Sequence, residues 1–256
     1  QYFSLMALGQ IRGEENRTNL MEALRKGSKA LEKPWAAISL GVLTHLDYEE
    51  MGTGATVDEG VGEALLREMK ELKNPGTLSA LSVALGLVRY TDSADTLREL
   101  LEEKKNQDDL AGYLCIGLAL MNDQSSLDEI RNLVETSVRR PNRLQQAAIA
   151  LGKLGDKEAA DTLVKLMTEG DQNLAKMSAI ASALGFIGDR RTIDPLIKML
   201  FDEGITDLSR AFAAVALGGV ADKELLPWNS KIGTNLNYRA AVETLTNQIS
   251  GILDIL

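Results

Sequence analysis

The sequence is poor in the residues that most often build reactive centres. It contains one cysteine and one histidine among 256 residues. A single cysteine excludes an internal disulfide framework, and a histidine-based metal site needs more ligands than His45 alone can supply. We expect Cys115 to be a small buried residue, because free cysteine packs as a small hydrophobe. The sequence therefore predicts neither a metal site nor a bound cofactor.

Aromatic residues, prolines and long apolar runs are also scarce. Aromatic residues make up 4% of the chain, and there are five prolines. No segment shows the alternation of apolar and polar residues that is typical of a β-strand. No apolar run reaches the ~18 residues that a membrane span requires, and the longest, such as residues 211–221, are typical of buried helices. We therefore expect no β-sheet and no membrane insertion.

Positive charge is in deficit. The chain has 28 Lys and Arg against 37 Asp and Glu, which gives a net charge of −9. Proteins that bind nucleic acid present a basic face, so we expect no nucleic-acid partner. Two arginine groups stand out, and each is more typical of a solvated turn than of a phosphate clamp. They are Arg139, Arg140 and Arg143, and Arg190 and Arg191.

What the sequence does contain is a repeat. A triplet of a small residue, leucine and a small residue returns five times at a spacing of 33 residues. We call the third residue of each triplet the anchor. A fixed period of this length indicates a stack of similar supersecondary units, rather than a globule with one central pocket. The five anchors are Gly86, Ala119, Gly152, Gly185 and Gly218, and two earlier copies have Gly9 and Gly41.

Each unit is predicted to contain two helices. In the fifth copy, Ala160, Leu163 and Met167 fall on one face at helical spacing, Gly170 ends that helix, and a second helix begins at about Leu174. One helix of each pair is apolar nearly all round and is expected to be an inner helix, whereas the other has a polar face and is expected to be outer. The prediction is an all-α, right-handed α-solenoid of about seven two-helix repeats over residues 1–226.

An aspartate follows four of the anchors at a distance of four residues. Aspartate is among the preferred N-cap residues, so we expect these side chains to cap the outer helices. A ladder of functional carboxylates is the alternative. The four residues are Asp123, Asp156, Asp189 and Asp222.

Two runs carry a family resemblance. ALGKLGD at residues 150–156 and ALGFIGD at residues 183–189 resemble the short bacterial type of HEAT repeat that is named after phycobilisome lyases. The resemblance covers about residues 1–226 and implies a HEAT-like solenoid acting as a non-catalytic scaffold or adaptor between proteins. The alternative that it implies is an enzyme or chromophore-handling protein of the phycobilin-lyase type. HEAT-type di-iron hydroxylases use repeated His-Glu pairs, whereas here Leu46 follows His45, so the resemblance predicts no catalytic or metal-binding residue.

The period is broken once, by an acidic insertion. The anchors Gly41 and Gly86 are 45 residues apart, and residues 47–63 contain six acids but no lysine or arginine. The insertion is rich in glycine, so we expect a mobile loop at about residues 46–60. Insertions in repeat proteins map to one face that often binds partners, and a basic protein partner would suit the acids. A tolerated, solvated loop is the alternative. The candidate partner-binding residues are Glu49, Glu50, Asp58 and Glu59.

An aromatic stripe is the second candidate surface. Six residues before the anchor stand Phe3, Trp35, Tyr113 and Phe212 in four of the seven copies. If this face lines the concave side of the solenoid, then Trp35, Tyr113 and Phe212 could anchor a protein or peptide partner. If it packs against the next repeat, the stripe is core.

The ends of the chain carry two further expectations. Residues 227–256 are predicted to cap the last repeat, because the end of a solenoid otherwise exposes an apolar face. Trp228 would pin this segment. Gln1 lies inside the first repeat copy, so we expect the chain to be a fragment or a processed form.

Overall fold

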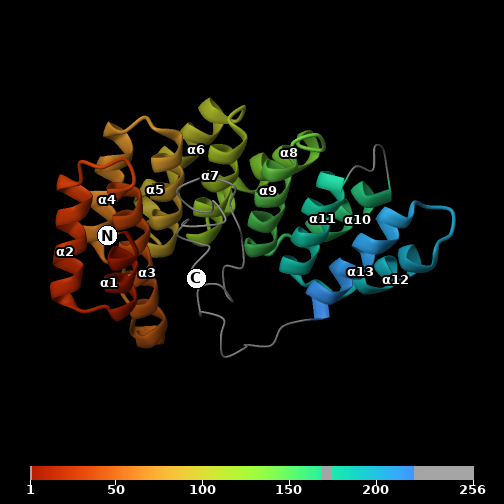
Figure 1. The fold of residues 1–256 in the computed structure, drawn as a ribbon, viewed down its shortest axis with the longest axis horizontal. Helices are drawn as coiled ribbons and strands as arrows, with labels where there is room; N and C mark the ends of the chain where they lie inside the picture. Colours follow the sequence, from red (N-terminus) through yellow and green to blue (C-terminus); the bar gives the residue numbers. More distant parts are fainter. Residues whose placement is uncertain (1, 169–173, 222–256) are drawn as a thin grey trace. The chain divides into compact units, whose positions relative to one another are not determined.

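The computed structural model describes residues 2–168 and 174–221, and every regular element in these ranges is helical. They form two compact units, residues 2–123 and 124–221, and Figure 1 shows the helices of both. The predicted all-α class is confirmed, and both units have the layered helix packing of an α-solenoid. Seven inner and six outer helices lie in these ranges, in agreement with about seven repeats.

The first unit stacks four inner helices, each on the next, with three outer helices beside them. The inner helices are α1 (Tyr2–Ile11), α3 (Glu32–Met51), α5 (Pro75–Val88) and α7 (Asp108–Leu120). The outer helices are α2 (Glu14–Lys26), α4 (Glu59–Glu71) and α6 (Ala94–Lys104). Short 3₁₀ turns, η1 (Gly52–Gly54) and η2 (Thr91–Ser93), precede α4 and α6.

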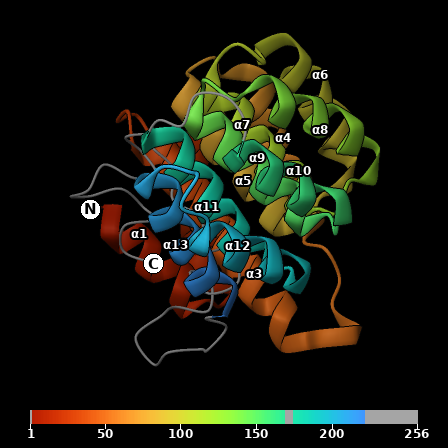
Figure 2. The same cartoon turned by 90° about the vertical axis from the view of Figure 1, so that its right-hand side faces the viewer.

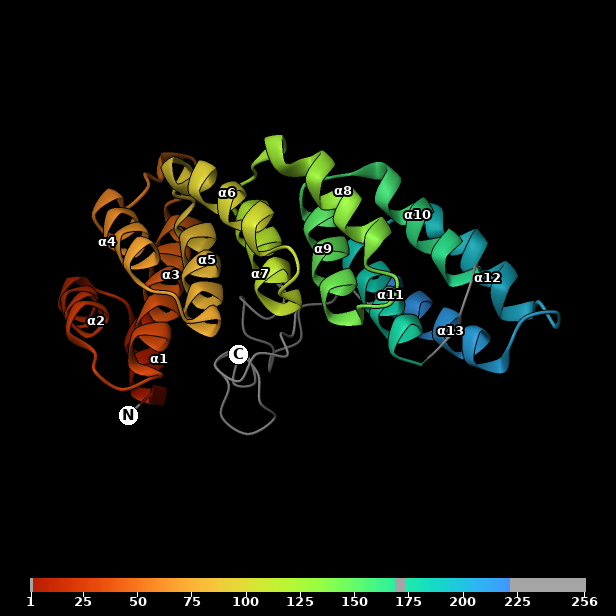
Figure 3. The ribbon, with the colours of Figure 1, turned by 90° about the horizontal axis from the view of Figure 1, so that it is seen from above.

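The second unit repeats the pattern. Its inner helices are α9 (Pro141–Lys153), α11 (Leu174–Ile187) and α13 (Asp207–Ala221), and its outer helices are α8 (Leu127–Thr136), α10 (Lys157–Thr168) and α12 (Ile193–Phe201). The 3₁₀ turns are η3 (Gln124–Ser126) and η4 (Arg190–Thr192). Each outer helix packs on the inner helix that follows it. Figure 3 shows α8, α10 and α12 in one row and α9, α11 and α13 in another.

Burial follows the predicted division between layers. In the inner helix α5, every residue from Thr77 to Val88 is buried. In the outer helix α6, by contrast, Leu97 and Leu101 are buried, whereas Asp95 and Glu99 are exposed. A helix that is apolar all round needs neighbours on several sides, and the stacked inner layer supplies them.

Inner helices approach each other closely at the anchors Gly86 and Gly185. A Cβ atom added at Gly86 would stand 2.6 Å from the carbonyl oxygen of Gly117 in α7. One added at Gly185 would stand 3.1 Å from the Cα of Gly219 in α13. At these two anchors, packing between consecutive repeats therefore requires a small side chain.

Inner helices end in a recurring turn three residues after the anchor. The residue there has φ between 60° and 76° in five copies, in the left-handed region. The next N–H then bonds back across the turn, as from Tyr90 to the Leu85 carbonyl at 3.2 Å, which is the bond of a Schellman motif. The five residues are Arg12, Arg89, Asn122, Gly155 and Gly188.

Helix α3 is the exception, and it corrects the predicted loop. The expectation of a loop is wrong for residues 46–51, which continue α3 to a length of 20 residues. Thr44 occupies the position where the other inner helices turn. A β-branched residue strongly disfavours positive φ, and the Thr44 hydroxyl instead donates to the Leu40 carbonyl at 3.0 Å. The helix ends only at Gly52, which has φ of 59°.

The predicted C-terminal cap, residues 227–256 with Trp228, lies outside the described residues. Among the helices that the structure describes, none is long and apolar enough to cross a membrane.

Candidate functional site

The inserted sequence forms a distinct structure between α3 and α4. We call residues 44–58 the α3–α4 junction. It consists of the last turns of α3, the 3₁₀ turn η1 and an extended approach to α4. Figure 2 shows the lower end of α3 and the connection that rises from it toward α4. The local sequence explains this course, because residues 44–51 contain no glycine or proline to end the helix, whereas Gly52 and Gly54 follow directly.

Asp58 closes the junction by capping α4. Its Oδ1 accepts the backbone N–H of Val61 at 3.0 Å. The same carboxylate receives two hydrogen bonds from Arg17 of α2, at 2.6 Å from Nε and 2.7 Å from Nη2. Burial by itself raises the pKa of Asp58, but the hydrogen bonds from Arg17 and Val61 and the Arg17 charge outweigh it and hold the pKa below its ordinary value. Asp58 is therefore an anion at neutral pH.

The extension of α3 is held by arginines from the two neighbouring inner helices. Arg12, directly after α1, contacts Asp47 at 3.2 Å and also pairs with Glu50. Arg89, directly after α5, contacts Glu49 at 3.2 Å and lies 4.0 Å from the centre of the Tyr48 ring, as a cation–π contact. Both arginines occupy the left-handed turn positions described above. The turns that end α1 and α5 therefore supply the positive charges that pair with the acids of α3.

The predicted acidic residues therefore lie together, but most of their charges are paired with arginines. Glu49, Glu50 and Asp58 each have an arginine partner, whereas Glu59 is exposed in the first turn of α4. Sequence reasoning missed the arginine partners, which lie 38 to 41 positions away in the chain. The local charge is still negative. With Asp47 and Glu14 counted, five carboxylates contact Arg12, Arg17 and Arg89.

A pocket of about 240 Å³ opens within the junction. It lies between the extension of α3, the approach to α4 and the last residue of α5. Its lining residues are Thr44, Asp47, Tyr48, Met51, Thr56, Val57, Asp58 and Val88. Most of the lining comes from residues that a regular repeat lacks, so the insertion creates this pocket.

Of the three stripe residues in the first unit, Trp35 and Tyr113 are core, whereas Phe3 is 52% exposed. Trp35 and Tyr113 are each 1% exposed. The Trp35 ring stacks on Tyr2, with ring centres 6.0 Å apart, and meets the edge of Phe3 at 5.6 Å. As a partner-binding surface, the prediction is therefore wrong for Trp35 and Tyr113, because the inner helices cover both side chains. Phe212 lies in α13 of the second unit and is partly exposed.

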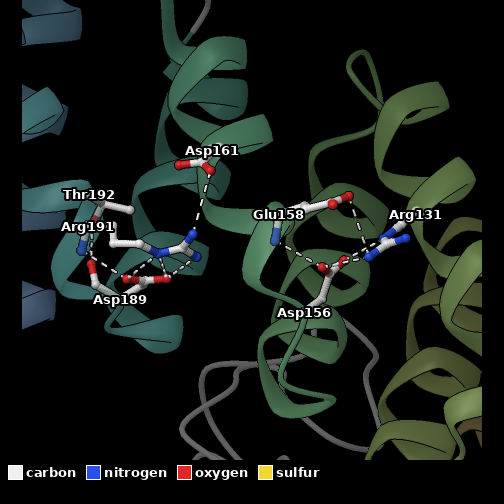
Figure 4. A network of polar contacts seen from close by, with 7 residues as sticks. All are labelled: Arg131, Asp156, Glu158, Asp161, Asp189, Arg191 and Thr192. Carbon is white, nitrogen blue, oxygen red and sulfur yellow. Dashed lines mark hydrogen bonds and ion pairs between the residues drawn. The ribbon is translucent and has the colours of Figure 1, made fainter.

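Asp156 caps the outer helix α10, as predicted, whereas Asp189 caps the 3₁₀ turn η4 that precedes α12 rather than the outer helix itself. Asp156 accepts the backbone N–H of Glu158 at 3.0 Å, and Asp189 accepts that of Arg191 at 2.9 Å. Asp222 lies outside the described residues. Figure 4 shows Asp156 and Asp189 with the charged side chains around them.

Each of these aspartates also pairs with an arginine, which the sequence analysis did not predict. Arg131 of α8 reaches Asp156 at 2.7 and 2.9 Å. Its hydrogen bond lowers the pKa of Asp156. One repeat earlier, Arg98 of α6 contacts Asp123 in the same way, at 2.6 Å. The repeat spacing could have predicted this pairing, because Arg98 and Arg131 are 33 residues apart, as are Asp123 and Asp156.

In the next repeat, the position equivalent to Arg131 is occupied by Val164. Asp189 therefore has no arginine partner at that position. Asp189 pairs instead with Arg191 of its own turn, at 2.5 Å, and Arg191 also reaches Asp161 at 3.8 Å (Figure 4). Carboxylates engaged in caps and arginine pairs stabilise the repeat turns, and this geometry supports the structural interpretation over a functional ladder.

The described ranges hold no group of three or more His, Cys, Asp or Glu side chains that could bind a metal ion. Cys115 is fully buried in α7, as predicted for a small packing residue, and His45 is buried in α3.

The comparisons with known proteins concern the repeat. The family of HEAT repeats matches residues 104–182 and 144–217. Comparison with the curated proteins found no match. The matched ranges run from the last residue of α6 into α13 and contain the anchors Ala119, Gly152 and Gly185. Over residues 104–217, this chain is therefore similar to HEAT repeats.

Proposed function

We propose that the chain is a non-catalytic HEAT-repeat scaffold or adaptor that binds a basic protein partner through the α3–α4 junction. HEAT repeats typically serve as protein-interaction scaffolds, and their stacked helices present extended binding surfaces. We further propose that the repeats are of the short bacterial type, as the runs at 150–156 and 183–189 suggest, and that nucleic acid is not a partner, because the net charge is −9.

The main support for this proposal is the excess of carboxylates at the α3–α4 junction. The stacking of the repeats does not require this junction. The junction adds residues to one repeat alone, and the other inner helices end without them. Five carboxylates contact three arginines there, and Glu59 follows Asp58 in the first turn of α4. Such a patch attracts a basic partner and speeds encounter in low salt. Exposed Glu49, Glu50 and Glu59 and the half-exposed Met51 give it both charged and apolar contact area.

The test compares two variants with the same change in net charge. The junction variant carries Glu49→Gln, Glu50→Gln, Asp58→Asn and Glu59→Gln. Asparagine at position 58 keeps a good N-cap residue. The control variant carries Asp95→Asn, Glu99→Gln, Glu102→Gln and Glu103→Gln on the exposed face of α6.

Partners are captured from an extract of the source cells, and association rates are then measured at several salt concentrations. We expect wild type and control to capture the same protein, with an association rate that falls as salt rises. We expect the junction variant to associate more slowly. Equal rates for the two variants would contradict a role for the junction. Capture of a bilin-carrying protein, or turnover of a bilin, would favour the phycobilin-lyase alternative.

A further inference from the structure

We propose that the pocket of the α3–α4 junction receives a lysine or arginine side chain of the partner. This inference rests on the proposed function and names the chemistry of its contact. The pocket volume of about 240 Å³ is below the roughly 300–1,000 Å³ typical of small-molecule sites. A pocket of this size suits one long side chain rather than a cofactor.

The polar atoms around the pocket are largely hydrogen-bond acceptors. Asp47 and Asp58 are carboxylates, and an ionised carboxylate can only accept. Thr44 is 8% exposed, and its hydroxyl proton is directed at the carbonyls of Leu40 and Gly41, each at 3.0 Å. The lone pairs of its oxygen remain as acceptors. A lysine ammonium and an arginine guanidinium have donors and no acceptors, so they complement this lining.

The remaining walls are partly apolar, and they also include Tyr48 and Thr56, whose hydroxyls can accept as well as donate. Met51 and Val57 flank the pocket, and Val88 closes it from the end of α5. Lysine and arginine carry three or four methylene groups below the charge and bury them along apolar surface. The pocket therefore offers contacts to both parts of such a side chain.

Intramolecular arginines do not take this place. Arg12, Arg17 and Arg89 pair with junction carboxylates, but none of them lines the pocket. Asp58 already accepts bonds from Arg17 and Val61. Asp47 has its 3.2 Å contact with Arg12, which is shared with Glu50. Asp47 is therefore the carboxylate best placed to receive an additional donor.

The test uses single amino acid derivatives and the full chain. N-acetyl-lysine methylamide is titrated against the ¹⁵N-labelled protein, and the backbone amides of Thr56, Val57 and Asp58 are followed by NMR. N-acetyl-arginine methylamide is the second cationic probe. N-acetyl-norleucine methylamide is the neutral control, because it keeps the aliphatic chain without the charge. We expect saturable shifts with millimolar dissociation constants for the two cations, and much weaker shifts for norleucine.

Three variants assign the contact. Asp47→Asn should weaken lysine binding about two- to fivefold, the range of a partly exposed ion pair. Thr56→Trp, at an exposed position of the rim, should fill the pocket and abolish the shifts. Asp95→Asn on α6 makes the same change of charge away from the pocket and should bind lysine like wild type.

Norleucine binding as strong as lysine binding would overturn the proposal, as would equal effects of Asp47→Asn and Asp95→Asn. The outcomes also separate this inference from the proposed function. Salt-dependent partner binding without lysine-induced shifts would overturn the pocket and leave the scaffold in place. Pocket-specific shifts without a captured partner would support the basic-group pocket and count against the scaffold.

Discussion

Arg17 of α2 and Asp58, the N-cap residue of α4, form a two-pronged ion pair with N–O distances of 2.6 and 2.7 Å. The pair joins two outer helices across the one place where the repeat is interrupted. Because Asp58 also caps α4, a single carboxylate fixes both the start of that helix and its attachment to α2.

Replacing this arginine should therefore lower stability in a pH-dependent way. We expect Arg17→Met to reduce the free energy of unfolding by about 1 kcal/mol at neutral pH, since both groups are partly exposed. Arg17 helps to keep the pKa of Asp58 below its ordinary value. The stability linked to it is therefore present above the unfolded pKa of about 3.9 and is lost as pH falls through the lower folded pKa.

Urea unfolding of wild type and Arg17→Met between pH 7 and pH 2.5 checks this prediction. The difference between the two proteins should stay constant down to about pH 4 and then shrink. Arg25→Met, at an exposed position of the same helix, is the matched control and should change stability by less than about 0.5 kcal/mol. A difference that persists unchanged at the lowest pH would show that Arg17 acts through packing rather than through Asp58.

The close approach at Gly86 predicts a second effect. In Gly86→Ala, the new methyl group would stand 2.6 Å from the Gly117 carbonyl oxygen and 2.8 Å from the Leu120 Cβ. We expect a loss of about 1–3 kcal/mol from overpacking, although alanine has the higher helix propensity. In Gly60→Ala the nearest atom is the flexible end of Arg17 at 3.1 Å, so this exposed control should be nearly neutral. Thermal unfolding compares the two variants, and equal midpoints would contradict close packing at the anchor.

Asp156 should matter more for stability than Asp128, which also lies beside Arg131. Its side chain is 1% exposed, it caps α10, and it accepts two bonds from Arg131, whereas Asp128 is 96% exposed and lies 3.5 Å from the same guanidinium. We expect Asp156→Ala to cost about 2 kcal/mol through the lost cap and the lost pair. Asp128→Ala should cost less than about 0.5 kcal/mol. Denaturant midpoints measure both, and similar losses would refute a special role for the capping carboxylate.

Gly218 provides a test of the predicted C-terminal cap. Gly86 and Gly185 are crowded by the next repeat, but no described residue lies within 4 Å of a Cβ added at Gly218. If residues 227–256 cap the stack, a chain ending at residue 226 should melt at a lower temperature or aggregate. Gly218→Ala should stabilise that shortened chain by up to about 1 kcal/mol through helix propensity.

The same substitution in the full chain should bring no such gain, because the capping segment would meet the new methyl group. Differential scanning calorimetry of the four proteins measures the result. An equal gain in both chain lengths, or a truncation that leaves the melting temperature unchanged, would mean that residues 227–256 do not cover this face.

The turns show how far the sequence leads. Gly155 and Gly188, at the left-handed position after the anchor, could be identified from residue type alone, because glycine readily adopts positive φ. Arg12 and Arg89 take the same conformation without that signal. Thr44 gives the opposite result, since its branched side chain keeps α3 helical past the point where the other inner helices turn. The periodicity located these positions, and residue type accounts for the glycine turns and for the missing turn at Thr44, but not for the turns at Arg12 and Arg89.

The sequence by itself determined the helical repeat, its division into inner and outer helices, the small anchors and the capping aspartates. These features depend on neighbours within one repeat or on a fixed period, so a linear pattern carries them. Only the tertiary structure decided that Trp35 and Tyr113 are core, that the junction acids pair with Arg12, Arg17 and Arg89, and that a pocket lies between them. Those facts depend on contacts between residues about 30 to 40 positions apart, and on the path of the longer α3, which sets where such residues meet.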